Sequence, residues 1–413
     1  MTVSGPSPGY TRPGNTSPGN TRPQSVVIGA LGVNQILAWG STYYLTTVLA
    51  KPVAADTGWG LTWVVGGFTL GLLAAGIVSP RIGRDIDRYG GRPVLILSAW
   101  LNAAGLAALG AAPNLGMFLI GWLAIGVGMG MGLYDAAFAA LGRLYGVAAR
   151  RAITALTLYG GFASTVCWPL SAFLVETLGW RGACFVYAAV SLTVTLPLCF
   201  ALPKEERRDP VAAAAQTKAG AAANPAPRHG AMLYVTLALC LTLSSVISAV
   251  VSVHLLSFLD ARGVALAAAV GLGALIGPSQ VGARVLEMFL GQKLHPVWTM
   301  VLSTVLVAAG LAVLLSGLPL VALGLVAYGA GVGIRSIARG TLPLALFGAA
   351  GYATLMGRLG MPSMIAQALA PAASAWLIEI GGVTATLVVL VALALLNLFS
   401  ALALVPAAGK GAA

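Results

Sequence analysis

The chain has 413 residues, of which 58% are hydrophobic and only 8% are charged, and its formal net charge is +12. Soluble globular domains carry about 25% charged residues, so this composition excludes a water-soluble domain and makes a lipid bilayer the expected solvent. The basic residues fall in short intervals between apolar runs, so we expect the bilayer, and not nucleic acid, as the partner.

Residues 1–25 are rich in Pro, Gly, Ser, Thr and Asn and predict a disordered N-terminal tail. A hydrocarbon core requires about 20 apolar residues per helix. Runs of that length follow at 26–50, 60–80, 93–112, 114–142, 152–175 and 181–202. After the polar interval 203–230, further runs lie at 231–259, 264–290, 296–316, 318–341, 350–378 and 383–405.

These runs predict an all-α membrane protein with 12 transmembrane helices in two six-helix bundles, 26–202 and 231–405. The interval 203–230 is the expected cytoplasmic linker, and residues 406–413 form a C-terminal tail. Basic residues mark cytoplasmic loops. With both termini in the cytoplasm, that side receives Arg12, Arg22, Arg84, Arg88, Arg92, Arg150, Arg151, Lys204, Arg207, Arg208, Lys218, Arg228, Lys293 and Lys410, and the other side receives Lys51, Arg181 and Arg262. This asymmetry predicts the orientation.

An internal repeat relates the two halves. The segment from Gly83 to Arg92 lies between the second and third runs, and a similar segment from Ala283 to Lys293 lies between the eighth and ninth. The matching positions are Arg84 with Arg284, Asp87 with Glu287, and Gly91 with Gly291. Repeated halves are typical of secondary transporters, whose solute site lies near mid-membrane between them.

The same loop carries a family resemblance. Gly83, Asp87, Arg88, Gly91 and Arg92 resemble the G-x-x-x-D-R-x-G-R-R/K signature of the major facilitator superfamily, and the triplet 179–181, Gly-Trp-Arg, resembles the start of the sixth helix in many members. The resemblance implies a 12-helix transporter in which these loop residues, with Glu287 in the second half, gate the cytoplasmic side. An alternative is a basic loop that only sets topology.

Two further resemblances concern the cargo. The segment 56–60, Asp-Thr-Gly-Trp-Gly, is similar to monocarboxylate-type carriers. The segments 134–145 and 160–169 resemble bacterial members associated with resistance to trivalent arsenicals. Residues 26–50 contain no Asp or Glu, which departs from the drug/proton antiporters of the superfamily, whose first helix carries an acid.

Polar side chains inside the apolar runs are costly and therefore indicate packing or a water-filled path. Gln35, Trp39, Thr42 and Thr46 are spaced by four, three and four residues, which places them on one face of the first helix. The seventh helix carries Ser245 and Ser248 in a similar alignment. We expect both sets to line the substrate site, with interhelical hydrogen bonding as the alternative.

Charged residues in the membrane are fewer. Asp135 is expected to be either a proton carrier or half of an ion pair with Arg339 or Arg358. Arg284 is a candidate for binding an anionic cargo, with pairing to Glu287 as the alternative; Arg335, Arg339 and Arg358 are further cationic candidates. His254, near the outer end of the seventh helix, is a candidate for proton coupling, or a hydrogen-bonded interface residue.

The chain has no G-x-x-x-x-G-K-[ST] sequence and no Cys/His cluster at metal spacing, so we expect no cofactor, no metal and no enzymatic activity. An ion gradient is then the expected energy source. The sequence predicts a monomeric, proton-coupled secondary transporter of a small anionic organic solute in a bacterial inner membrane, working by alternating access. Efflux of a toxic compound such as a trivalent metalloid, bound through Cys167 and Cys240, is the alternative. A membrane enzyme or a non-transporting sensor remains open.

Overall fold

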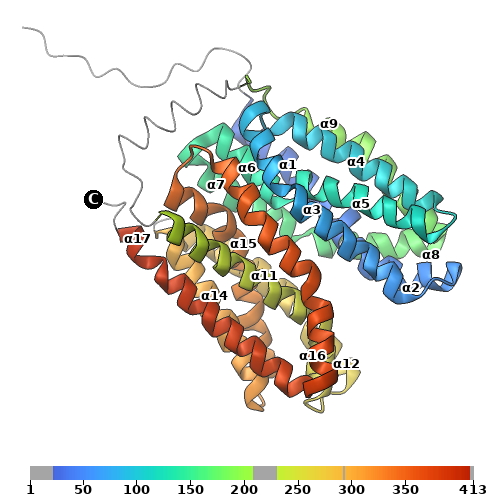
Figure 1. The fold of residues 1–413 in the computed structure, drawn as a ribbon, viewed down its shortest axis with the longest axis vertical. Coiled ribbons are helices and arrows are strands. Elements are labelled where there is room, and N and C mark those ends of the chain that lie inside the picture. Colours follow the sequence, from blue (N-terminus) through green and yellow to red (C-terminus); the bar gives the residue numbers. More distant parts are fainter. Residues whose placement is uncertain (1–21, 208–229, 292–293, 410–413) are drawn as a thin grey trace, which may run out of the picture.

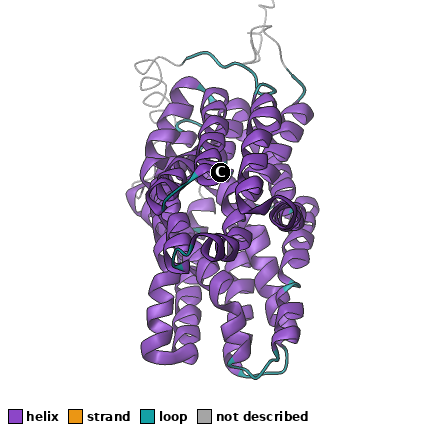
Figure 2. Ribbon diagram, turned by 90° about the vertical axis from the view of Figure 1, so that its right-hand side faces the viewer, coloured by secondary structure: helices purple, strands orange, loops and turns teal. Residues whose placement is uncertain are grey.

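The computed structural model describes residues 22–207, 230–291 and 294–409. The expected N-terminal tail and linker therefore lie largely outside the described residues, as do the last four residues of the chain. The regular structure of the described part is helical, with no strand in it (Figure 2). The predicted all-α class is confirmed for this part of the chain.

Helices before residue 203 form a first group. They are α1 (Gln24–Ala38), the π-helix η1 (Trp39–Tyr43), α2 (Leu45–Thr57), α3 (Leu61–Tyr89), α4 (Gly91–Ala111), α5 (Leu115–Gly132), α6 (Tyr134–Tyr145), the 3-10 helix η2 (Gly146–Ala148), α7 (Ala149–Gly161), α8 (Ala163–Val190), the π-helix η3 (Ser191–Thr195) and α9 (Leu196–Cys199). A second group follows residue 229. It contains α11 (Gly230–Asp260), α12 (Leu266–Gly273), α13 (Ile276–Leu290), α14 (Pro296–Ser316), α15 (Val321–Phe347), α16 (Tyr352–Ala403) and α17 (Val405–Gly409).

Eight helical runs of the described chain are long and apolar enough to cross a membrane. Two of them, Leu115–Cys199 with 85 residues and Tyr352–Ala408 with 57, far exceed the roughly 20 residues of one span. Long helices in both runs are interrupted at a glycine. Gly179 in α8 has φ 70° and Gly382 in α16 has φ 77°, a left-handed conformation that only glycine adopts without steric cost. Each of these helices therefore consists of two helical segments joined at that residue.

The two groups of helices lie side by side, and α16 of the second group runs along α3 of the first (Figure 1). Further contacts join α16 to α6 and both α13 and α15 to α7, whereas α2 and α12 lie at the ends where the groups diverge. Two apolar cores consist mainly of side chains from the first group, and two consist entirely of side chains from the second. Burial therefore holds each group together mostly through its own residues.

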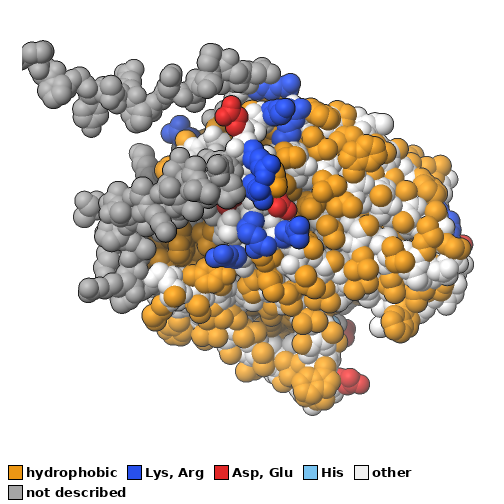
Figure 3. Space-filling model, turned by 45° about the horizontal axis from the view of Figure 1, so that its top comes forward, with side chains coloured by type: hydrophobic (Ala, Val, Ile, Leu, Met, Phe, Trp, Pro, Cys, Tyr) orange, Lys and Arg blue, Asp and Glu red, His pale blue; other side chains and the backbone are white. Residues whose placement is uncertain are grey.

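Small residues bring the two groups into contact where α3 crosses α16. A Cβ atom on Gly83 would overlap the carbonyl oxygen of Ala353, and one on Gly357 would overlap that of Ser79. Such close backbone approach is typical of helix packing in membranes, where van der Waals contact replaces the hydrophobic driving force. The crossing includes Gly83, directly before the exposed Arg84. Lys and Arg side chains gather at one end of the molecule (Figure 3), which we call the basic end.

Candidate functional site

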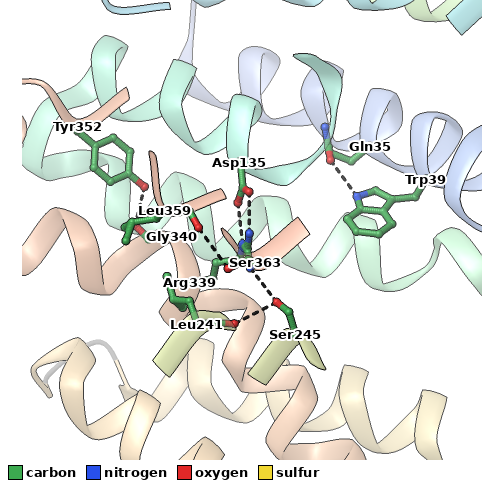
Figure 4. Close-up of polar contacts among 10 residues, drawn as sticks. All are labelled: Gln35, Trp39, Asp135, Leu241, Ser245, Arg339, Gly340, Tyr352, Leu359 and Ser363. Atoms are coloured by element: carbon green, nitrogen blue, oxygen red, sulfur yellow. Dashed lines mark hydrogen bonds and ion pairs between the residues drawn. The ribbon is translucent and has the colours of Figure 1, made fainter. Parts of the chain in front are cut away.

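An ion pair joins the two groups of helices at the centre of the molecule (Figure 4). Arg339 of α15 donates from Nε to Asp135 Oδ1 and from Nη2 to Asp135 Oδ2, each at 2.7 Å. The two side chains are only 15% and 7% exposed. Two parallel charge-assisted bonds in a buried setting are the strongest form of this interaction. Of the two arginines that the sequence offered as partners, the structure uses Arg339, and Arg358 is exposed.

Asp135 occupies a break in the backbone that the sequence did not reveal. The run 114–142 was expected to be one helix, but Leu133 leaves the helical conformation with ψ −173°, and α6 starts at Tyr134. Asp135 therefore lies in the first turn of α6, where the free N–H groups and the macrodipole of the helix favour a negative charge. Broken helices at mid-membrane are a common way for transporters to place charged groups.

Arg284 is the third charged residue of the centre, and it is 6% exposed. Its Nε donates to the Gly333 carbonyl at 3.1 Å and to Ser336 Oγ at 3.0 Å. Nη1 reaches the Thr157 carbonyl in the first group at 3.3 Å, and Nη2 reaches Gln280 Oε1 at 3.4 Å. Arg284 therefore bridges both groups through uncharged acceptors. Within the described chain it has no ion pair.

The predicted site residues of the first helix lie in unequal environments. Gln35 is buried and donates to the Gly132 carbonyl at 2.7 Å, and its Oε1 accepts from Trp39 Nε1 at 3.1 Å (Figure 4). Thr42 is buried and donates to the Ala38 carbonyl of its own helix at 2.6 Å. The Thr46 hydroxyl oxygen is buried without a hydrogen-bond partner in the described structure.

The π-helix η1 explains why the predicted residues of the first helix do not share one face. A π-turn inserts an extra residue into the helix and rotates everything after it. Tyr43, which the sequence reasoning missed, is brought to the boundary between the groups, where its hydroxyl accepts from Gln367 Nε2 of α16 at 2.6 Å. The spacing of polar residues gave no signal for this register change.

Aromatic rings form a wall on the first group. The Trp39 ring lies 5.0 Å from Tyr43, 6.0 Å from Tyr44 and 5.1 Å from Tyr134, measured between ring centroids. Tyr134 stacks on Phe138 at 5.1 Å. Because Tyr134 also donates to the Thr157 carbonyl at 3.2 Å, its hydroxyl shares an acceptor with Arg284. The wall thus begins beside the Arg284 guanidinium.

The predicted residues of the seventh helix lie on α11. Ser245 is buried, donates to the Leu241 carbonyl at 3.0 Å and accepts a 3.4 Å contact from Arg339 Nη1 (Figure 4). Ser248 donates to a carbonyl of its own helix at 2.9 Å. His254 lies farther along α11, where its Nε2 is buried without a hydrogen-bond partner in the described structure. The structure therefore brings Ser245 to the ion pair and leaves His254 apart from it.

At the basic end, Asp87 and Gly83 contact the second group, and the other predicted loop residues contact the first. Asp87 Oδ2 accepts from the Thr354 backbone N–H at 2.7 Å and from the Thr354 hydroxyl. Thr354 lies in the first turn of α16, so the carboxylate satisfies a free N–H of that helix. The Arg92 guanidinium lies 4.9 Å from the Phe200 ring, Arg88 is exposed with its guanidinium 5.2 Å from the Tyr89 ring, and Gly91 packs on Ala140.

A second contact at the basic end involves Arg150 of α7. Its Nη2 donates to the Gly291 and Leu294 carbonyls, at 2.8 and 2.7 Å, beyond the C-terminus of α13. Glu287 accepts from Thr299 Oγ1 at 2.6 Å and does not pair with Arg284. Arg150 and Glu287 line a cavity of about 360 Å³ between the groups. Burial lowers the pKa of the Arg150 guanidinium, and Glu287 acts in the opposite direction.

Sequence reasoning also missed Arg143 at the end of α6. Its Nε forms an ion pair with Glu205, and its Nη1 donates to the Ile86 carbonyl at 2.8 Å and to the Asp87 carbonyl. A cation placed on the last carbonyls of a helix is stabilised by the macrodipole. Arg143 therefore fixes the end of α3 from which Asp87 projects.

The four cysteines do not converge. Cys184, Cys199 and Cys240 belong to three different apolar cores, and Cys167 donates to the Ile36 carbonyl at 3.5 Å. No group of three or more His, Cys, Asp or Glu side chains in the described part of the chain could hold a metal ion. Thiol ligation of a metalloid needs two or three such ligands.

Comparison with known proteins shows the family. The family model of the Major Facilitator Superfamily matches residues 31–287. Monocarboxylate transporters 11 and 14 of Mus musculus are 34% identical to the chain over 145 and 149 residues. These alignments cover 34% and 35% of this chain, and only 30% and 27% of the two mouse proteins.

Solved structures share the fold. The human organic anion transporter MFSD10 (TETRAN) superimposes with a TM-score of 0.72 at 18% identity, covering 92% of this chain and 100% of that one. The proton:xylose symporter XylE bound to 6-bromo-6-deoxy-D-glucose gives 0.67 at 14% identity, covering 91% and 93%. FucP in its outward conformation gives 0.71 at 12% identity, covering 92% and 98%. The chain belongs to the major facilitator superfamily.

Proposed function

We propose that this member of the major facilitator superfamily is a proton-coupled secondary transporter that carries a small organic anion by alternating access. We further propose that it crosses a bacterial inner membrane 12 times as a monomer, with both termini in the cytoplasm. In this proposal, the halves 26–202 and 231–405 rock against each other around the centre described above. The basic end is the cytoplasmic end, because Lys and Arg accumulate there.

The observation that carries this proposal is the environment of Arg284. A buried cation is costly unless an anion compensates it, and this guanidinium meets only carbonyl, hydroxyl and amide oxygens in the described structure. It also contacts both halves, through Thr157 in one and Ser336 in the other. A carboxylate cargo bound here would balance the positive charge of Arg284 and contact both of the surfaces that separate during transport.

The relatives fit an anionic cargo. Two mouse proteins with similar segments are monocarboxylate transporters, and a human protein with the same fold is an organic anion transporter. The aromatic wall of Trp39, Tyr43, Tyr44 and Tyr134 offers a surface for the apolar body of an organic solute.

The polar contacts between the halves support a state that is closed at the basic end. Hydrogen bonds from Thr354 to Asp87 and from Arg150 to Gly291 lie at that end, and the Asp135–Arg339 pair lies at the centre. These contacts must break for the basic end to open. Asp87, which satisfies an N–H in the first turn of α16, then acts as a latch on the cytoplasmic side.

Proton coupling is proposed to act through Asp135. Protonation of this carboxylate removes the charge that Arg339 binds across the halves, so it weakens the closed state. Ser245 contacts the same guanidinium and can accept one of its hydrogen bonds when the carboxylate is neutral. A proton on Asp135 therefore favours opening of the basic end, and its release favours closure.

Efflux of a trivalent metalloid receives no support from the described residues. The reactive species in such binding is a cluster of thiolates. Cys184 and Cys240 lie in cores of opposite halves, and Cys199 is hydrogen bonded to Asn34 at 3.3 Å. In this proposal, the ion gradient sets the direction of transport.

The test compares solutes that differ only in charge. Purified protein in liposomes is given an inward proton gradient and labelled lactate, benzoate, or their uncharged amides. We expect accumulation of at least one acid and of neither amide, and its loss in Arg284→Gln. The matched control is Arg262→Gln, because Arg262 also donates to backbone carbonyls of Val313 and Leu318 but lies at the opposite end. Uptake of an amide equal to that of its acid, or unchanged uptake in Arg284→Gln, contradicts the proposal.

A further inference from the structure

A second uncompensated arginine, Arg335, lies on the same face of α15 as Arg339, four residues away. Its Nε is buried and has no hydrogen-bond acceptor within the described chain. Unlike Arg339, it forms no ion pair with a described carboxylate. A buried guanidinium N–H without an acceptor is costly, so its presence points to a group that the described residues do not supply.

Arg335 belongs to the same centre as Arg284. Arg284 and Arg339 are both close enough to Arg335 for their like charges to repel it electrostatically. Tyr43 of the first group and Tyr328, two turns before Arg335 on α15, also interact with it electrostatically. Arg335 therefore lies within electrostatic range of Arg284 and Arg339, and of Tyr43 in the aromatic wall.

The charge of this centre is unbalanced. The centre contains three guanidinium groups, Arg284, Arg335 and Arg339, and one carboxylate, Asp135. The carboxylate already forms a bidentate pair with Arg339. The four side chains together carry a charge of about +2 when all are ionised. A monoanion would leave one positive charge uncompensated, whereas a dianion would cancel both.

We propose that the site takes an organic dianion, with one anionic group on Arg284 and the other on Arg335, and the body of the solute against the aromatic wall. This inference rests on the proposed anion transport and sharpens its substrate class. The two roles differ. Arg284 already donates to four oxygens and bridges the halves, so it holds an anion within a formed network. Arg335 supplies an Nε donor that no described residue satisfies.

The test uses pairs of probes that differ by one charge. Succinate, glutarate and phthalate are compared with their monoamides at pH 7.5, by calorimetric titration of the purified full chain. One hydrogen-bonded charge pair is worth about tenfold or more in affinity, so at least one diacid should bind about tenfold more tightly than its monoamide. Arg335→Gln should remove this preference while leaving monoamide affinity within about threefold, and Arg335→Lys should keep part of it.

A second measurement separates this role from a structural one. Because Arg335 is uncompensated without cargo, Arg335→Gln should raise the melting temperature of the ligand-free protein and lose the extra stabilisation by the diacid. A structural arginine would give a lower melting temperature. Arg262→Gln, at the opposite end, should keep the diacid preference.

The failures are distinguishable. Equal affinity for diacids and monoamides, with both lost in Arg284→Gln, overturns the dianion assignment and leaves anion transport standing. A diacid preference that persists in Arg335→Gln also overturns the assignment. Absence of binding by every acid in the panel, in a protein that binds a neutral solute, overturns the proposed function itself.

Discussion

Replacing Asp135 by Asn removes the negative charge that Arg339 binds from the other half of the molecule. Both hydrogen bonds of the pair are 2.7 Å long, and both side chains are largely buried. Loss of one partner of such a pair typically costs about 3–5 kcal/mol, because the other charge stays buried without compensation. At about 1.4 kcal/mol per factor of ten, the state closed at the basic end should lose at least about two orders of magnitude in relative population.

Two transport assays on the same vesicles separate the roles of this residue. If Asp135 takes up and releases a proton in each cycle, the Asn variant should lose accumulation against a gradient and keep counterflow, in which labelled and unlabelled cargo exchange without net proton movement. If the ion pair serves only folding, accumulation and counterflow should fall together, in proportion to the amount of folded protein.

The matched control removes both charges. Asp135→Asn combined with Arg339→Gln leaves neither member of this pair charged, and neutral replacements of buried pairs are often well tolerated. We expect this double variant to recover melting temperature and counterflow, and still to fail in accumulation. Full gradient-driven accumulation by the single Asn variant, corrected for protein amount, refutes both roles of Asp135.

Three further substitutions test the basic end. Asp87→Asn should slow initial uptake at near-normal surface expression, because it weakens a helix-end contact of about 0.5–2 kcal/mol to Thr354; unchanged uptake kinetics speak against the latch. Gly83→Ala should disfavour the closed state, because its Cβ would overlap α16. Gly282→Ala, whose Cβ would have nothing within 4 Å, should not. Opening can be followed by thiol labelling of the buried cysteines, and equal labelling of both variants contradicts this expectation. His295 caps α14 by accepting an N–H on Nδ1 at 3.2 Å, and burial, followed by the charge of Arg150, lowers its pKa below 6.5. Because the folded state favours the neutral imidazole, the contribution of His295 to stability should be present above pH 6.5 and fade as the pH falls through the lowered pKa. His295→Asn should remove that pH dependence. If the melting temperature changes with pH equally in both proteins, His295 does not have this role.

The sequence predicted the features that depend on composition and local spacing. Apolar runs of about 20 residues follow from the thickness of the bilayer, and the resemblance of the loop at 83–92 led to the superfamily that the comparisons confirm. In the predicted polar stripe of the first helix, Trp39 contacts Gln35, and the π-helix that begins at Trp39 changes the register of the residues after it. Such a register change depends on packing with other helices, so the period of the sequence does not contain it.

The sequence could not predict which distant residues pair, for a different reason. Spacing along a helix indicates the depth of a side chain in the membrane, but the rotation of that helix depends on its neighbours. Both Arg339 and Arg358 were therefore possible partners of Asp135, and only the packing of α15 against α6 selects Arg339. In the same way, Arg284 turns toward Ser336 on α15, and Glu287 turns toward Thr299 on α14.

The charges of the centre also bear on how the empty carrier moves. When both ends close during rocking, water is excluded, and the cost of uncompensated charge at Arg284 and Arg335 rises. A bound dianion cancels that charge, so the loaded carrier should change state faster than the empty one. Efflux of labelled phthalate from preloaded vesicles should therefore accelerate when unlabelled phthalate is present outside. Arg335→Gln, which lowers the charge of the empty centre, should reduce that acceleration, and an equal acceleration in both proteins would show that Arg335 does not limit the return step.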